Sequence, residues 1–187
     1  MEDKMLRRNM WNTGGIAGLI LGFISTAYLF ASQWIGQMET AIWVGTSLNM
    51  VLWCMKFAGC IWTMFFFMKK FASDNPDITN SDTFHLGIIM ALSSAIVYAA
   101  FSFANVAFIS ADLFAEQMEQ TLQALAPMMD SNTMSQMDKM MERLPQITFF
   151  SNLTYCFLYG LFLSFILSRN IPGKDPFADY KPQEQQS

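Results

Sequence analysis

Four long apolar segments separated by polar stretches dominate the hydrophobic pattern of the chain. They run from about residue 13 to 36, 43 to 70, 84 to 110 and 147 to 168. A helix of about 20 apolar residues crosses the hydrocarbon core of a bilayer, and each segment reaches that length. The pattern therefore predicts an all-α membrane protein with four transmembrane helices.

The first apolar segment follows three basic residues, Lys4, Arg7 and Arg8, as the apolar core of a signal peptide does. Its run of about 22 residues is longer than the roughly 15 of a signal-peptide core. We therefore expect it to remain in the membrane as the first span.

Residues 111 to 145, between the third and fourth segments, have an amphipathic pattern. Apolar residues recur at helical spacing opposite glutamate and glutamine, and a second such pattern follows Pro127 and the polar run that begins at Asp130. We predict an amphipathic helical hairpin outside the hydrocarbon core. Its methionine-rich face suits either an adaptable binding surface or mutual packing of two short helices on the bundle or the headgroups.

Two further polar stretches delimit the membrane region. The connector SDNPDITNSD contains Pro76 and is predicted to be a turn, with Ser81 or Asp82 capping the third helix. Residues 169 to 187 are rich in proline, charge and glutamine, so we predict a mobile cytoplasmic tail. Residues 1 to 168 then form a single transmembrane domain.

Small residues recur every four positions in several of the segments. This spacing places them on one side of a helix and lets another helix backbone approach closely. The helix-packing residues that we predict are Gly14, Gly18, Gly22, Gly87, Ala91, Ala95, Ala99 and Gly160.

One charged residue, Lys56, lies inside the second apolar segment. Trp43 and Lys69, which are residue types of the membrane interface, are each roughly 20 Å away along a helix. On insertion scales a central lysine costs about 2.5 to 3.5 kcal/mol. We therefore expect the ammonium group to point into the bundle toward polar partners or a bound anion, or else to lose its proton. The alternative is that it snorkels to the outer headgroups.

Several polar residues of the other spans are candidates to accompany this lysine. In the third segment they step by three and four residues and so share one side of the helix. The anion or lipid site that we predict comprises Lys56, Asn49, Thr63, Tyr98, Asn105, Asn152 and Tyr159.

Composition supports the membrane class and narrows the chemistry. The chain has 187 residues, of which 53% are hydrophobic and only 14% charged, and its net charge of -4 argues against nucleic-acid binding. Its three cysteines and single histidine have no metal-ligand spacing, and no hydrolase, metalloprotease or phosphate-loop motif is present. We predict a protein that is not an enzyme and that has no catalytic residue, cofactor or metal site.

The distribution of positive charge predicts the topology. Lysine and arginine flank the N-terminus, the second connection and the tail, whereas the first turn has none and the third connection is acidic overall. The positive-inside rule then places both termini in the cytoplasm and the hairpin on the external side, which is the periplasm of a Gram-negative cell.

Two stretches are the most characteristic of the chain: FFFMKKFASDNPDITNSDTFHLG after the second span and MSQMDKMMERLPQ before the fourth. With these stretches and the order of its elements, the chain resembles the bacterial membrane proteins of the DUF4199 family, which are common in Bacteroidota. The resemblance covers nearly the whole chain. It implies a location in the bacterial inner membrane, and it transfers no active-site residue.

Two functions from different classes fit these observations. The first is a non-catalytic scaffold or regulatory partner of a membrane enzyme or complex, acting with another membrane protein or as a homo-oligomer. The alternative is a small transporter or lipid-handling protein that binds an anionic substrate or headgroup at Lys56, such as that of a phospholipid or a polyprenyl phosphate. Four helices without an evident internal repeat argue against alternating access.

Overall fold

The computed structural model describes residues 2–38, 42–125 and 131–171, and its regular structure there is entirely helical. Four helices are long and apolar enough to cross a membrane: α1 (Glu2–Gly36), α2 (Ile42–Asp74), α3 (Asn80–Ala104) with its π-helical extension η1 (Asn105–Ile109), and α6 (Leu144–Asn170). The shorter helices α4 (Ala111–Leu125) and α5 (Ser131–Glu142) lie between η1 and α6. The predicted all-α fold with four candidate spans is confirmed, and the chain is a multi-pass membrane protein.

The helix bounds extend beyond the apolar segments that predicted them. α1 begins at Glu2 rather than near residue 13, and α2 continues to Asp74. A hydrophobic window detects only the part of a helix that matches the hydrocarbon core, and the polar turns outside it remain helical. α6 continues to Asn170, and the remainder of the predicted tail, residues 172–187, lies outside the described residues, as does Pro127.

The start of α3 corrects one prediction. Its N-cap is Thr79, whose side chain accepts a hydrogen bond from the Asp82 backbone N–H, while the Asp82 carboxylate accepts from the Thr79 N–H. The two residues therefore form a capping box. Neither Ser81 nor Asp82 is the N-cap, because an acidic residue in the third helical position reaches back to a threonine that precedes the helix.

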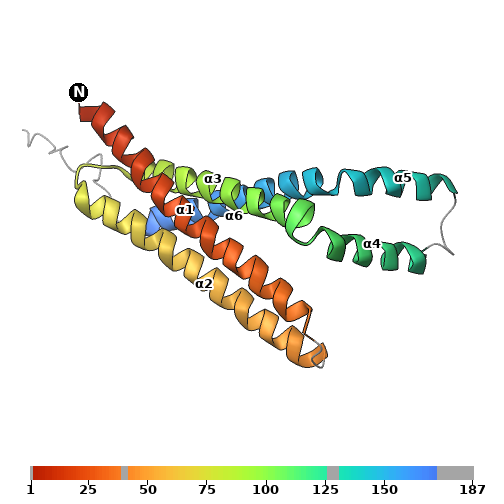
Figure 1. The fold of residues 1–187 in the computed structure, drawn as a ribbon. Helices are drawn as coiled ribbons and strands as arrows, with labels where there is room; N and C mark the ends of the chain where they lie inside the picture. Colours follow the sequence, from red (N-terminus) through yellow and green to blue (C-terminus); the bar gives the residue numbers. More distant parts are fainter. Residues whose placement is uncertain (1, 39–41, 126–130, 172–187) are drawn as a thin grey trace, which may run out of the picture.

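The helices are arranged as two antiparallel pairs (Figure 1). α1 pairs with α2, α3 pairs with α6, and α1 packs on α3. The start of α1, the α2–α3 connector and the end of α6 lie at one end of the molecule. Toward the other end the two pairs diverge, and the α4–α5 hairpin projects beyond α3 and α6.

The glycine ridge of α1 faces α3. A Cβ atom added at Gly18 would lie 2.5 Å from the Ser93 Cβ and 2.7 Å from the Met90 carbonyl oxygen. Added atoms at Gly14 and Gly22 would crowd Ile89 and Val97 in the same way. Such close approach of two helix backbones allows extensive van der Waals contact within a bilayer.

The small residues of α3 do not lie on the face of α3 that contacts α1. They lie on the face that contacts α6. Gly87 lies against Ser164, and a Cβ atom on Gly160 would be 2.6 Å from the Ala91 Cβ. The Ser164 hydroxyl also donates a hydrogen bond of 2.9 Å to the Phe84 carbonyl oxygen. Ala95 and Ala99, which continue the ridge, are fully buried. α3 is thus the central helix, with α1 on one face and α6 on another.

Burial within α2 and α6 is confined to one half of each helix. In α2 the buried residues are Thr63, Met64, Met68 and Phe71, all in the half nearer the α2–α3 connector. In α6 the buried residues all lie at Ser164 or later. The four helices therefore pack together near the α2–α3 connector. Farther from it, α2 and α6 lie apart from each other.

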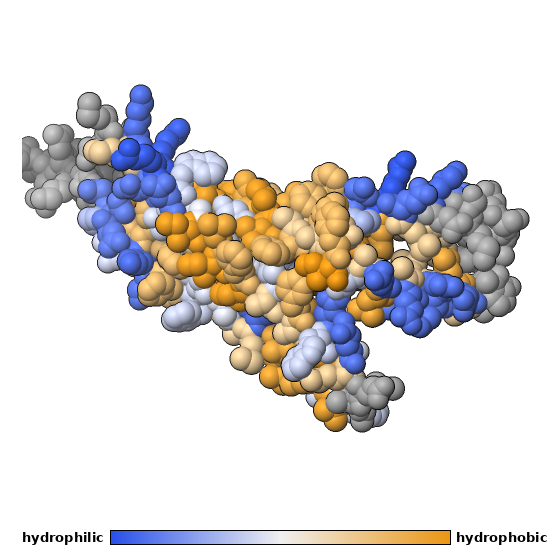
Figure 2. All heavy atoms as spheres, viewed as in Figure 1, coloured by the Kyte–Doolittle hydropathy of each residue, from blue (hydrophilic) through white to orange (hydrophobic). Residues whose placement is uncertain are grey.

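The surface agrees with a membrane setting. Figure 2 shows hydrophobic side chains over the middle of the bundle, and hydrophilic ones at the N-terminal end of α1 and along the α4–α5 hairpin. Large apolar side chains such as Trp43 and Trp62 are 86% and 68% exposed. Exposure of this kind is expected where lipid, rather than water, surrounds the helices.

Candidate functional site: the cleft between α2 and α6

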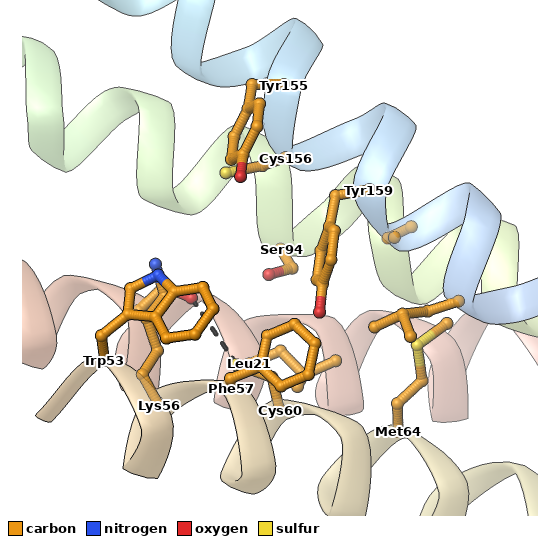
Figure 3. Close-up of a pocket in the computed structure, with 14 residues that line it drawn as sticks. Leu21, Trp53, Lys56, Phe57, Cys60, Met64, Ser94, Tyr155, Cys156 and Tyr159 are labelled. Carbon is orange, nitrogen blue, oxygen red and sulfur yellow. Dashed lines mark hydrogen bonds between the residues drawn. The ribbon is translucent and has the colours of Figure 1, made fainter. Parts of the chain in front are cut away.

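A cavity of about 130 Å³ lies where α2 and α6 begin to diverge (Figure 3). α1 and α3 contribute Leu21, Ser25, Ala91 and Ser94 to its wall. Trp53 of α2 and Tyr155 of α6 line it and are also 52% and 70% exposed, so the cavity reaches the lipid-facing surface. The remaining lining residues are Lys56, Phe57, Cys60, Met64, Cys156, Tyr159, Gly160 and Leu163. We call this site the α2–α6 cleft.

Lys56 is half-buried in the wall of the cleft. Its Nζ atom lies 4.8 Å from the centroid of the Tyr28 ring and 5.1 Å from that of the Tyr98 ring. Tyr28 belongs to α1 and Tyr98 to α3. The ammonium group is therefore directed at the neighbouring helices, which is the inward-facing alternative of the two considered from the sequence. Attraction to the two aromatic faces offsets part of the cost of its desolvation.

Tyr159 reaches into the cleft from α6 (Figure 3). Its ring lies 5.7 Å from that of Phe57, and Phe57 stacks on Trp53 at 5.4 Å. The Tyr159 hydroxyl oxygen is buried and has no hydrogen-bond partner among the described residues. Leaving a buried hydroxyl unpaired costs about 1 to 3 kcal/mol. The cleft therefore combines a cation with an unused hydrogen-bonding group.

Sulfur and hydroxyl groups line the same cavity. The Cys60 Sγ lies 3.9 Å from the Ser25 Oγ, across the α1–α2 interface. Cys156 lines the cleft from α6. Among the residues that the structure describes, no group of three or more histidine, cysteine, aspartate or glutamate side chains is placed to hold a metal ion.

Two of the seven predicted site residues, Lys56 and Tyr159, line the cleft, and the Tyr98 ring contacts the Lys56 ammonium group. The other four, Asn49, Thr63, Asn105 and Asn152, do not line it. These four residues are not brought to the cleft, because a shared side of a helix does not give a shared depth. Asn49 and Thr63 are each about 10 Å from Lys56 along α2, and Asn105 is equally far from Tyr98 along α3.

The three asparagines of this group form hydrogen bonds elsewhere in the bundle. Asn49 Oδ1 accepts a hydrogen bond of 2.7 Å from the Ser32 hydroxyl and links α2 to α1. Asn152 Nδ2 donates to the Ser102 Oγ, also at 2.7 Å, and links α6 to α3. Asn105 Oδ1 accepts from the Ser110 hydroxyl at 3.1 Å, where η1 ends.

Sequence reasoning missed the contribution of α1 to the site. Ser25 and Tyr28 are polar side chains within the first apolar segment, and Ser32 continues the row at a spacing of three and four residues. The same spacing rule that selected the polar side of the third segment would have found them. Tyr155 carries the same signal, because it follows Asn152 by three residues and precedes Tyr159 by four, but it was not included in the predicted site.

The four predicted apolar segments contain no aspartate or glutamate, so no carboxylate in them can neutralise Lys56. A fixed cation with hydroxyl groups nearby, in an apolar cleft open to lipid, suits the binding of an anionic amphiphile. The same groups lack the paired acid and base that hydrolytic or group-transfer chemistry generally requires.

Comparisons with known proteins gave one match. The family model described as "Protein of unknown function (DUF4199)" matches residues 12–169, a range that includes most or all of each candidate span and the whole hairpin. No curated protein and no solved structure matched the chain.

Proposed function

We propose a function for this chain, which belongs to the DUF4199 family of proteins of unknown function. It is a non-catalytic protein of the bacterial inner membrane that binds an anionic lipid at Lys56. The bound group would be the phosphate of a phospholipid or of a polyprenyl phosphate, with the chain lying along α2 and α6. The observation that carries the proposal is Lys56, which lines the α2–α6 cleft and has its ammonium group next to the Tyr28 and Tyr98 rings, in a bundle whose four apolar segments contain no carboxylate.

The energetics support an anion in this position. Two tyrosine faces attract the ammonium, each by about 0.5 to 2 kcal/mol, but an isolated lysine near the bilayer centre costs about 2.5 to 3.5 kcal/mol. A phosphate would supply the missing charge and would accept hydrogen bonds from Lys56 and from the unpaired Tyr159 hydroxyl. Trp53 and Tyr155, exposed at the mouth of the cleft, would contact the acyl or prenyl chain.

Lys56→Met tests the proposal because it keeps the apolar stem and removes the charge. Without ligand the variant should unfold at a higher temperature than the parent, since an uncompensated buried charge is lost. Phosphatidic acid or a polyprenyl phosphate added to detergent micelles should raise the unfolding temperature of the parent and leave Lys56→Met unchanged. Lys70→Met, at an exposed lysine of the same helix, is the matched control and should respond as the parent does.

Each result has a clear meaning. The lipid that gives the larger shift in the parent identifies the type of carrier. A Lys56→Met variant that responds to both lipids as the parent does would overturn the proposal. A variant less stable than the parent would show instead that the lysine is held by protein groups and contributes to the packing of the bundle.

A second candidate function, a scaffold or regulatory partner for a membrane enzyme or complex, is supported by the α4–α5 hairpin. It projects from the bundle and contacts the remainder of the described structure mainly at its base (Figure 1). A photo-cross-linking residue at the exposed Glu119 of α4 should capture a protein, whereas one at the lipid-facing Trp62 should not. Adducts with a second copy alone would indicate a homo-oligomer.

A further inference from the structure

A second groove lies between α1 and α3 at the end of the bundle where the chain begins. It has a volume of about 680 Å³, and its lining includes Lys4, Arg7 and Trp11 of α1 and His85, Ile88 and Ile89 of α3. We propose that this groove binds the headgroup of an anionic phospholipid at the membrane surface. The site is separate from the α2–α6 cleft and does not depend on Lys56.

The positive charges of the groove are placed on one face of α1. Lys4 and Arg7 are three residues apart, so their side chains are neighbours on the helix, and both are exposed. Trp11 follows Arg7 by one helical turn and is 60% exposed. Tryptophan next to lysine and arginine is typical of the interface between headgroups and hydrocarbon.

Among the described residues that line the groove, Asp82 is the acidic one, and one of its carboxylate oxygens, Oδ2, is engaged. Asp82 accepts hydrogen bonds of 2.9 Å from the Thr79 N–H and 2.8 Å from the Thr79 hydroxyl, which together close the N-terminus of α3. Its negative charge also interacts favourably with the α3 dipole. Among the described lining residues, the exposed charged side chains are those of Lys4 and Arg7, and both are basic.

His85 adds a ring of defined orientation to the groove. Its Nδ1 lies 2.7 Å from the Ser81 carbonyl oxygen, and because a carbonyl only accepts, Nδ1 carries a proton. Nε2 is then the ring nitrogen left for a ligand.

The groove has a basic end and an apolar end, as a phospholipid has an anionic headgroup and apolar chains. Lys4 and Arg7 lie before the apolar segment of α1, whereas Ile88 and Ile89 lie inside the apolar segment of α3. A headgroup phosphate next to the basic residues would therefore place the start of its acyl chains against the isoleucines. Basic pockets between transmembrane helices bind anionic headgroups by this combination.

The test measures lipid selectivity of the full chain. Native mass spectrometry in mixed micelles should show retention of dioleoyl phosphatidylglycerol over dioleoyl phosphatidylcholine. Removing both charges, in Lys4→Gln/Arg7→Gln, should weaken phosphatidylglycerol binding by roughly five-fold per residue, or about 25-fold together. The control Lys69→Gln/Lys70→Gln removes the same charge from the end of α2, on the same side of the membrane, and should change binding by less than about two-fold.

Other results would overturn the proposal. Equal losses in the two double variants would mean a general surface-charge effect, and no preference for phosphatidylglycerol in the parent would mean no anionic site. Competition by inorganic phosphate at equal concentration would show that a soluble anion, rather than a lipid, is the ligand. Should the Lys4→Gln/Arg7→Gln protein fail to fold, Arg7→Gln alone is the second variant, and binding equal to that of the parent would contradict the proposal.

Discussion

Gly15 and Gly18 of α1 are three residues apart but have different surroundings. A Cβ atom added at Gly18 would clash with Ser93 and with the Met90 carbonyl group, whereas one at Gly15 would have no atom of α3 or of any other described helix within 4 Å. The requirement for glycine is therefore set by the position facing α3 rather than by the helix itself. Glycine elsewhere in a helix only lowers its stability.

This difference gives a paired prediction. Gly18→Ala should destabilise the protein by about 1 to 3 kcal/mol, the usual cost of overpacking, because a backbone carbonyl cannot move aside as a flexible side chain can. Gly15→Ala should be neutral or stabilise by up to about 1 kcal/mol. Thermal unfolding in detergent measures both. Equal unfolding temperatures for the two variants would mean that α1 does not pack closely on α3.

Residue patterns predicted only part of the candidate site. Lys56 was identified because its charge conflicts with an apolar segment, and the spacing of polar residues selected Tyr98, whose ring lies next to the Lys56 ammonium group. Spacing along one helix gives the side that a residue faces, but it does not give its depth relative to another helix. The predicted site therefore included Asn105 and Asn152, whose side chains bond to Ser110 and Ser102, and it did not include Tyr28.

At the scale of the helices, the packing of α3 against α6 depends on a small residue of α3 that faces a larger residue of α6. Gly87 leaves the space that Ser164 occupies, and the Ser164 hydroxyl uses that space to donate to the Phe84 carbonyl oxygen. Interhelical hydrogen bonds of this kind contribute on average about 0.6 kcal/mol in a bilayer. Close approach and hydrogen bonding are therefore coupled at one position.

A double-mutant cycle tests this coupling. Gly87→Ala should destabilise by about 1 to 3 kcal/mol, since its methyl group would overlap Ser164. Ser164→Gly should also destabilise, because it removes a hydrogen bond and adds a glycine to α6. In the double variant the methyl group would occupy the space vacated by the serine, so the loss should be smaller than the sum of the two. Strict additivity in urea or thermal unfolding would contradict the contact.

The helices themselves were more predictable than their arrangement. All four spans were found because length and apolar character are strong signals. The divergence of α2 from α6 had no such signal, since lipid accepts apolar side chains as readily as another helix does. Trp62, which is exposed, and Met68, which is fully buried, belong to the same apolar run, and hydropathy does not distinguish them.

At the scale of the whole molecule, the fold gathers most of the basic residues at one end. The start of α1, the end of α2 and the end of α6 lie together there (Figure 1). Lys4, Arg7, Arg8, Lys69, Lys70 and Arg169 belong to those three helix ends. The α4–α5 hairpin, at the opposite end, carries Lys139 among several acidic residues. The antiparallel arrangement of the helices thus turns a pattern along the sequence into a separation of charge across the molecule.

This separation predicts how the protein is inserted. Because positively charged loops are retained in the cytoplasm, the end that carries the basic residues should be cytoplasmic and the hairpin external. With Cys54, Cys60 and Cys156 replaced by alanine, a single new cysteine reports the side. Asn132→Cys, in α5, should react with a membrane-impermeant maleimide in intact cells. Ser73→Cys, in the last turn of α2, should react only after the inner membrane is opened.

The two positions also serve as controls for each other, because they lie at opposite ends of the molecule. Reaction of Ser73→Cys alone in intact cells would mean that the whole protein is inverted. The groove that contains Lys4 and Arg7 would then lie in the outer leaflet. Reaction of both cysteines in intact cells would mean that α3 does not cross the membrane, because α3 separates the α2–α3 connector from the hairpin. The antiparallel fold requires the two cysteines to differ in their reaction with the maleimide in intact cells. The charge separation requires Asn132→Cys to be the one that reacts there.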